Sequence, residues 1–164
     1  MGIKFTAHSI VWDNDFLRIA KIVAEHSTCT RKQVGAVIVR NKRIISTGYN
    51  GVPSGMKHCN EVFTQKDLTS PDFMKVHGEF SNKFEVHSEQ NAIAELSKNE
   101  VNGVGATLYT TLAPCSNCAK LIVAAGIKRV VYLEEYDRDM SGPELLRQAG
   151  IEVEWFNKGE LLRQ

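Results

Sequence analysis

The chain has 164 residues, of which 43% are hydrophobic and 24% are charged, and its formal net charge is +1. This length is typical of one domain, and this composition excludes the disordered and fibrous classes. Nucleic-acid-binding domains usually carry an excess of Lys and Arg, so the balanced charge favours a small-molecule substrate over nucleic acid.

The sequence also indicates a compartment. It contains no run of about 18 apolar residues, so we expect no membrane-spanning segment. Residues 1–15 lack the apolar stretch and cleavage site of a signal peptide, which predicts a cytoplasmic protein, in the host cytoplasm if the chain is viral. In a reducing compartment, the cysteines favour metal binding or catalysis over disulfides; they are Cys29, Cys59, Cys115 and Cys118.

The first part of the chain predicts a helix followed by a β-hairpin. Asp13 is a suitable N-cap for a helix that runs to about residue 24. Residues 34–39 and 43–49 have the pattern of two strands, and Asn41 and Lys42 form the turn between them. A loop rich in turn residues follows at 48–55.

Residues 56–85 show weak periodicity and mixed polarity. A structureless segment of this length is uncommon inside a compact domain, and such segments tend to be functional. We therefore expect this insertion to be fixed to the rest of the domain by a specific interaction.

In the second half, helices alternate with strands. The predicted elements are a helix at 87–98, a strand at 106–112, a helix at 115–125, a strand at 129–133, a helix at 142–149 and a strand at 151–155. This order predicts an α/β protein, a layered sheet with helices on both faces. We find no repeat or linker, so we expect a single domain over residues 1–164.

Two short motifs carry chemistry, and both lie at predicted helix starts. They are His87-Ser88-Glu89 and Pro114-Cys115-Ser116-Asn117-Cys118. A catalytic zinc takes three protein ligands and keeps one position open, which His87, Cys115 and Cys118 would provide. Cysteines at i and i+3 face one point, and a helix N-terminus favours the thiolate. Glu89 is then placed to move protons beside the metal.

Each motif has a plainer interpretation. A lone CxxC can be a redox pair. A structural zinc site would need a fourth ligand, for which Glu89 is available. The combination of HxE at one helix start with PCxxC at the next is more specific, and it resembles the signature of zinc-dependent nucleobase deaminases. That resemblance implies that zinc activates a water, and that Glu89 carries its proton to ring nitrogen N3 and later to the leaving amine.

Four longer segments resemble the deoxycytidylate deaminase family in particular. They are residues 29–39, 44–51, 87–93 and 109–118, within a resemblance that runs from about residue 10 to residue 155. It implies a three-layer α/β/α, cytidine-deaminase-like fold with a central mixed five-stranded sheet. It also implies hydrolysis of dCMP to dUMP and ammonia, which supplies dUMP for thymidylate synthesis.

The same resemblance places substrate contacts. Asn50 at the end of the second strand would lie near the sugar, although it is also a plausible turn residue. Arg31 precedes the first strand and would pair with the phosphate, unless it is a solvated surface residue. Ala113 would contribute to the pocket, and Tyr136 and Arg138, which follow the fourth strand, would lie at its edge.

Family members are typically homohexamers that dCTP activates and dTTP inhibits, with Mg2+ accompanying the triphosphate. Their effector lies close to a loop that matches Gly48, Tyr49, Asn50 and Gly51 here. The resemblance therefore implies a homohexamer with an effector site at these residues.

A second zinc is predicted from the remaining cysteines. Cys29 and Cys59 flank a long irregular segment that also contains histidines, and four ligands would form a closed structural site. Some viral members of the family resemble this pattern, which implies the ligand set Cys29, Cys59, His77 and Glu85. His58 competes for the fourth place, and a free cysteine can also be a small buried hydrophobe.

Three functions therefore compete. A nucleotide deaminase is the first, and a deaminase of free cytidine, tRNA adenosine, guanine or a pterin is the second. The tRNA version should be basic, which a net charge of +1 does not favour. The third is a non-catalytic zinc scaffold, which would have no need of the carboxylate of Glu89.

Overall fold

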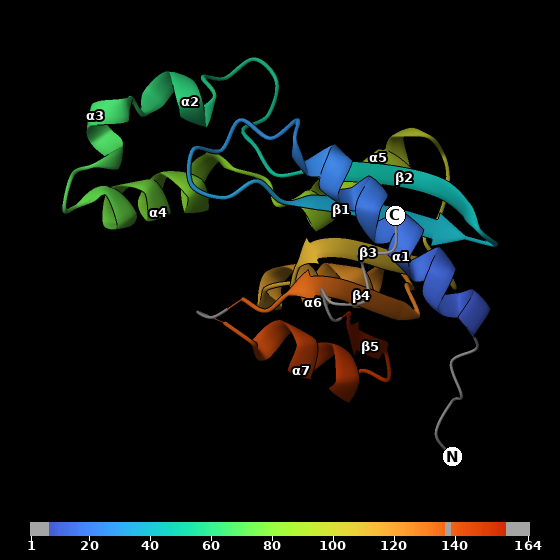
Figure 1. Ribbon diagram of the computed structural model, residues 1–164. Coiled ribbons are helices and arrows are strands. Elements are labelled where there is room, and N and C mark those ends of the chain that lie inside the picture. The colour runs from blue at the N-terminus through green and yellow to red at the C-terminus, as the bar shows by residue number, and fades with distance from the viewer. Residues whose placement is uncertain (1–6, 137–138, 157–164) are drawn as a thin grey trace.

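The computed structural model describes residues 7–136 and 139–156, in which one mixed sheet has the strand order β2-β1-β3-β4-β5 (Figure 1). The strands are β1 Gly35–Arg40, β2 Arg43–Tyr49, β3 Thr107–Leu112, β4 Arg129–Glu134 and β5 Glu152–Trp155. β1 pairs antiparallel with both β2 and β3, whereas β3, β4 and β5 are parallel. The predicted mixed five-stranded sheet is confirmed.

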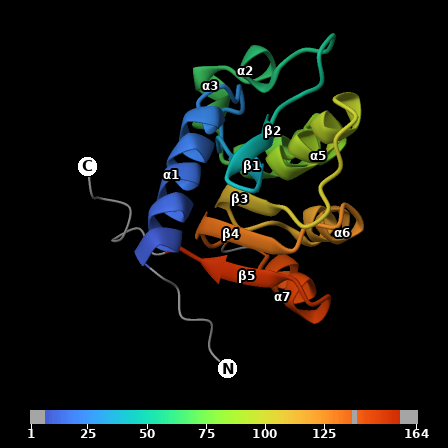
Figure 2. The same cartoon turned by 90° about the vertical axis from the view of Figure 1, so that its right-hand side faces the viewer.

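Helices cover both faces of this sheet, as Figure 2 shows. On one face lies α1 (Ala7–Ala24), and on the other lie α5 (Ser88–Lys98), α6 (Ser116–Ala124) and α7 (Ser141–Gln148). Side chains alternate along a strand, so Val37 packs towards α1 while its neighbour Ile38 packs towards α5. The three-layer α/β/α prediction is therefore confirmed. Among the described helices, none is long and apolar enough to cross a membrane.

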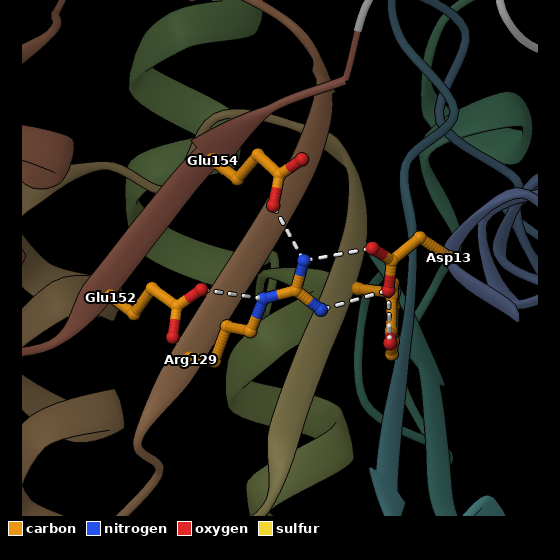
Figure 3. A network of polar contacts seen from close by, with 5 residues as sticks. Asp13, Arg129, Glu152 and Glu154 are labelled. Carbon is orange, nitrogen blue, oxygen red and sulfur yellow. Dashed lines mark hydrogen bonds and ion pairs between the residues drawn. The ribbon is translucent and has the colours of Figure 1, made fainter. Parts of the chain in front are cut away.

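The prediction that Asp13 caps the first helix is wrong, because α1 begins at Ala7 and contains Asp13. Asp13 is 2% exposed and faces the sheet, where its two oxygens accept hydrogen bonds of 2.8 and 2.7 Å from Arg129 (Figure 3). The Tyr109 hydroxyl donates a third, at 2.7 Å. A partner 116 residues away, rather than the helix terminus, satisfies this carboxylate.

The weak periodicity of residues 56–85 predicts an irregular segment, but this insertion is largely helical. It forms three helices that extend to one side of the sheet in Figure 1: α2 (Cys59–Val62), α3 (Gln65–Leu68) and α4 (Phe73–Phe84). Aromatic rings fill the space between them, and Phe63 stands edge-on to both Phe73 and Phe80. This small core encloses Cys29 and Cys59, apart from the two main cores on the sheet.

Candidate functional site

The candidate site forms where α5 and α6 begin, at the carboxyl end of β3. His87 is the N-cap of α5 and Cys115 is the N-cap of α6, and both have extended backbone angles. Cys118 lies in the first turn of α6, so its sulfur points back towards Cys115. Two helix N-termini with their partial positive charges therefore converge on one point, which favours thiolates and other anions there.

Two glycines allow these helix starts to come so close. A Cβ on Gly48 of β2 would lie 2.3 Å from the carbonyl oxygen of Ser88, so α5 can lie against the sheet only because this position has no side chain. A Cβ on Gly142 of α7 would lie 1.9 Å from the carbonyl oxygen of Pro114, directly before Cys115. Both helix starts are therefore held by backbone contacts that any side chain would push apart.

The side chains of His87, Cys115 and Cys118 have the geometry of a three-ligand zinc site. His87 Nδ1 lies 3.5 Å from Cys115 Sγ and 3.4 Å from Cys118 Sγ. Tetrahedral zinc with Zn–N of about 2.0 Å and Zn–S of about 2.3 Å places nitrogen and sulfur about 3.5 Å apart. All three donor atoms lie within 4.8 Å of one another, and a fourth position remains for water or substrate. The donor set therefore fits a catalytic zinc.

The protonation states of these three groups depend on one another. A hydrogen bond from Cys118 lowers the pKa of Cys115 to about 4, although burial opposes this shift. The same hydrogen bond, together with burial, raises the pKa of Cys118. The pair thus shares one proton and carries a thiolate at neutral pH. The hydrogen bond to Cys115 also raises the pKa of His87, because the thiolate stabilises the imidazolium.

Glu89 lies in the first turn of α5, beside this donor set, and is only 4% exposed. Burial raises the pKa of its carboxyl group, whereas its own backbone amide, His87 and the hydroxyl of Ser88 lower it. The Ser88 hydroxyl donates a 3.0 Å hydrogen bond to Oε2. A buried carboxyl group whose pKa is raised is suited to accept and then release a proton.

A pocket opens beside Glu89 and brings most of the predicted substrate residues together. Arg31, Asn50, Ala113 and Tyr136 all line it. Arg138 falls outside the described residues. The other lining residues come from both donor sets, the loop before β1, the insertion and the end of β3: Cys29, Lys32, Val34, His77, Ser81, Glu85, His87, Ser88, Glu89, Leu112 and Cys115.

Asn50 is a buried residue of this pocket and more than a turn residue, with 8% of its surface exposed. Its amide nitrogen donates 2.9 Å to the carbonyl of Lys32, and its oxygen accepts from the backbone of Val34 at 2.8 Å. Asn50 therefore fixes the loop that precedes β1 while facing the pocket.

The residues predicted to bind an effector, 48–51, lie mostly outside this pocket. Asn50 lines it, and the other three do not. Gly48 packs under α5, Tyr49 is 41% exposed beside the ring of His26, and Gly51 pairs with Val86.

The second predicted ligand set also comes together. Cys29, Cys59, His77 and Glu85 present donor atoms within 4.8 Å of one another. His77 Nε2 lies 3.5 Å from Cys29 Sγ and 3.4 Å from Cys59 Sγ, and Glu85 Oε2 lies 3.7 Å from Cys29 Sγ. These lengths match the edges of a zinc tetrahedron, which are about 3.5–3.8 Å for N, O and S ligands. His77 rather than its competitor His58 belongs to the cluster.

The surroundings of this cluster suit a bound cation. Oε1 of Glu85 is buried without a hydrogen-bond partner, while the hydroxyl of Ser81 donates to Oε2 at 2.7 Å. Burial raises the pKa of Cys29 to about 11 and lowers that of His77, which keeps the thiol protonated and the imidazole neutral without a metal. A closed set of four donors of these types fits a structural zinc.

Sequence reasoning missed several residues of the pocket. Lys32 forms an ion pair of 2.7 Å with Glu134, which lies at the end of β4, and Ser81 orients Glu85 from α4. Lys32 could have been predicted from the sequence, because it follows Arg31, the predicted phosphate ligand. Ser81 could not, because its role depends on a helix that the pattern of the insertion did not reveal.

This fold, with an HxE helix start and a PCxxC helix start around one donor set, defines a zinc-dependent deaminase architecture. Residues 10–134 match the family model described as the cytidine and deoxycytidylate deaminase zinc-binding region. The chain belongs to this family.

Individual relatives and solved structures make the comparison more specific than the family alone. The deoxycytidylate deaminase of Enterobacteria phage T4 is 39% identical over 165 residues, covering 84% of this chain and 86% of its own. The dCMP deaminase of cyanophage S-TIM5, solved in complex with dCMP and dUMP, has a TM-score of 0.71 and 34% identity over 87% of this chain and 94% of its own. A tRNA:A34 deaminase, at 19% identity and a TM-score of 0.52, shares the fold alone.

Proposed function

We propose that this chain hydrolyses dCMP to dUMP and ammonia. The observation that carries the proposal is the buried carboxyl group of Glu89 beside the donor set His87, Cys115 and Cys118, in a pocket that also contains Arg31. Family membership and the phage dCMP deaminases, one solved with dCMP and dUMP, support the substrate.

In the proposed mechanism, Glu89 moves two protons. A zinc ion held by His87, Cys115 and Cys118 supplies Lewis-acid chemistry that makes water nucleophilic near neutral pH. Glu89 accepts a proton from the attacking water and gives it to N3 of the cytosine, as a new C–O bond forms at C4. The carboxylate then takes the second proton, from the new hydroxyl on C4, and passes it to the amine; the C4–N bond breaks, the C4 carbonyl forms, and ammonia leaves.

The remaining pocket residues bind and orient the nucleotide. Arg31 pairs with the 5′-phosphate, because a guanidinium group matches phosphate geometry. Asn50 lies beside the sugar, and Ala113 and Tyr136 complete the walls. The nearly complete burial of Glu89 excludes bulk water from the shuttle, which keeps the proton transfers directed.

The test is an ammonia-release assay on dCMP, CMP, deoxycytidine and dCTP. We expect turnover to be highest with dCMP and to collapse without the phosphate. Glu89→Gln keeps the shape of the side chain and removes the proton shuttle, so activity should fall about 10²- to 10⁴-fold while zinc content is unchanged.

The rival functions make different predictions in the same assay. A zinc scaffold would bind metal and turn over none of the four compounds. A cytidine deaminase would prefer the nucleoside, and a deaminase of another amino-heterocycle would react with none of them while remaining active on its own substrate. Any of these results would refute the dCMP proposal.

We also propose that Cys29, Cys59, His77 and Glu85 hold a second, structural zinc. Its support is the match of the donor distances to a tetrahedron and the buried, unpartnered oxygen of Glu85. Metal analysis should give two zinc ions per chain, and one in Cys59→Ala. A single zinc in both proteins, with the insertion ordered in both, would overturn this assignment.

Assembly and regulation complete the proposal. We propose a homohexamer, activated by dCTP with Mg2+ and inhibited by dTTP, in the cytoplasm, whose reducing conditions suit four cysteines that form no disulfide. The family resemblance of residues 48–51 supports the effectors. Light scattering with and without each triphosphate tests the assembly. Activity assays with Gly51→Ala, at an effector position outside the pocket, test the regulation.

A further inference from the structure

The loop of residues 27–34, which connects α1 to β1, is held between the two donor sets. It carries Arg31 and Lys32, the cationic residues of the pocket, and it begins next to the second donor set at Cys29. Three groups of contacts determine its shape, and they involve Cys59, Cys29 and Asn50.

The first contacts join the loop to Cys59. The backbone N–H of Thr30 donates to Cys59 Sγ at 3.4 Å, and the Thr30 hydroxyl lies 3.3 Å from the same sulfur. Thr30 is the immediate neighbour of Arg31, so a sulfur atom of the second donor set fixes the backbone on which that guanidinium group is carried.

The second contacts are those of Cys29. Cys29 is itself a residue of the loop, two positions before Arg31, and its sulfur lies 3.5 Å from His77 Nε2 and 3.7 Å from Glu85 Oε2. The loop therefore supplies one sulfur of the cluster and contacts the other through Thr30, next to the residues that carry the positive charges of the pocket.

The third contacts fix both ends of the loop to Asn50, at the end of β2. Asn50 binds the backbone of Lys32 and of Val34 at 2.9 and 2.8 Å. The hydroxyl of Ser27 donates to the carbonyl of Asn50 at 2.7 Å. With both ends anchored, the sulfur contacts act on the middle of the loop, where Thr30 and Arg31 lie.

We propose that the cluster of Cys29, Cys59, His77 and Glu85 is a positioning site for the substrate phosphate: it fixes the loop through Thr30, and so determines how well the pocket distinguishes a nucleotide from a nucleoside. The inference rests on the proposed function and assigns the cluster a role in specificity beyond stapling the insertion. A guanidinium group held in place before binding loses less freedom when it pairs with phosphate, and the affinity rises accordingly.

The cluster and the pocket are also joined through α4 and the segment before α5. His77, Ser81 and Glu85 line the pocket, and Glu85 stands two residues before His87. Loss of the cluster would therefore act on the side of the pocket that carries Arg31, while the donor set at Cys115 and Cys118 stays on a different helix.

The experiment compares binding of dUMP and deoxyuridine by calorimetry, and kcat/KM for dCMP and deoxycytidine. We expect Cys59→Ala to weaken dUMP binding about 10- to 100-fold, the loss of a charge-assisted phosphate contact, while deoxyuridine binding stays within about 2-fold. Product binding involves no turnover, so this measurement does not depend on the activity of the zinc-loaded enzyme.

A milder variant guards against misfolding. Thr30→Val removes the hydroxyl contact and leaves all four donors intact, so zinc content should be unchanged and dUMP affinity should fall about 2- to 12-fold. Thr69→Val makes the same chemical change at an exposed position of the insertion and should leave both affinities unchanged.

The outcomes are distinct. Equal losses of affinity for nucleotide and nucleoside would reduce the cluster to a structural role and overturn the inference. Unchanged dUMP binding in both Thr30→Val and a folded Cys59→Ala would overturn it too. If Cys59→Ala does not fold, Thr30→Val decides alone. Failure of the wild-type chain to turn over dCMP or bind dUMP would instead refute the proposed function.

Discussion

Arg129 holds α1 against the sheet, and its replacement by Met should destabilise the fold strongly (Figure 3). Its side chain is 13% exposed and binds Asp13 through two hydrogen bonds, with further ion pairs to Glu154 and Glu152. In Arg129→Met, the carboxylate of Asp13 would stay buried with only the hydroxyl of Tyr109 as a partner. Leaving one member of a buried ion pair uncompensated costs about 3–5 kcal/mol.

The reverse change should cost less. In Asp13→Leu, Arg129 keeps two carboxylates, so we expect a loss of about 1–3 kcal/mol. The double variant should be more stable than Arg129→Met alone, because no buried carboxylate is stranded and the carboxylates of Glu152 and Glu154 are 41% and 26% exposed to water.

Thermal and urea unfolding at one fixed protein concentration measure these changes. A loss of 3–5 kcal/mol corresponds to a fall in Tm of roughly 6–20 °C for a chain of this length. Arg18→Met is the matched control, since Arg18 pairs on the same helix with Asp15 in an exposed contact of 3.8 Å and should change stability by less than about 1 kcal/mol. Additive effects of Asp13→Leu and Arg129→Met, or a cost for Arg129→Met no larger than that of the control, would refute the reasoning.

Three further predictions concern the site. Gly48→Ala would place a Cβ 2.3 Å from the carbonyl oxygen of Ser88, so α5 must shift. We expect Tm and kcat to fall while zinc stays bound. An unchanged kcat would contradict the packing argument. Cys115→Ser should remove one zinc and the activity but leave the second zinc in place, as metal analysis would show; loss of both ions would mean that the two sites are not independent. Arg31→Met should raise KM for dCMP about 10- to 100-fold and leave deoxycytidine unaffected, and equal effects on both would place the phosphate elsewhere.

The first donor set could be predicted from the sequence because its ligands are close together in sequence at helix starts. His87 and Glu89 are two residues apart, and Cys115 and Cys118 are three apart, so local helix geometry alone directs each pair to one point. What the sequence did not show is how the two helix starts meet. The two helix starts can approach each other because Gly48 and Gly142 have no side chain where they contact backbone that is distant in sequence.

The insertion shows why the rest was missed. In α4 the buried face consists of Phe73, His77 and Phe80, which is a regular helical spacing. His77 breaks the apolar pattern because it counts as polar, although it is 1% exposed and its ring contacts those of Phe63 and Phe73 in tilted arrangements. A metal ligand inside an aromatic core thus hides the periodicity of the helix that carries it.

Asp13 illustrates the opposite error. A carboxylate near the predicted start of a helix favours an N-cap, since local rules consider only the helix itself. The partner that satisfies Asp13 is Arg129 on β4, and that contact exists only once α1 is packed on the sheet. Long-range ion pairs of this kind leave no mark in a local sequence window.

The charge of the two donor sets leads to a last prediction. With a divalent cation bound, His87, Cys115 and Cys118 form a neutral site, whereas Cys29, Cys59, His77 and Glu85 keep one negative charge. Because both sets border the same pocket, the substrate phosphate needs the nearby cations, and Lys32 shares its charge with Glu134 at 2.7 Å.

Glu134→Gln should therefore strengthen the attraction of the pocket for dCMP. The ion pair is exposed, with 49% and 38% of the two side chains accessible, so the expected gain is modest: KM for dCMP should fall about 1.5- to 5-fold at low ionic strength. The gain should diminish as salt is added, and KM for deoxycytidine should not change, because it carries no phosphate. A fall in KM that is equal for nucleotide and nucleoside, or that persists in high salt, would show that Glu134 acts on the shape of the pocket and not on its charge.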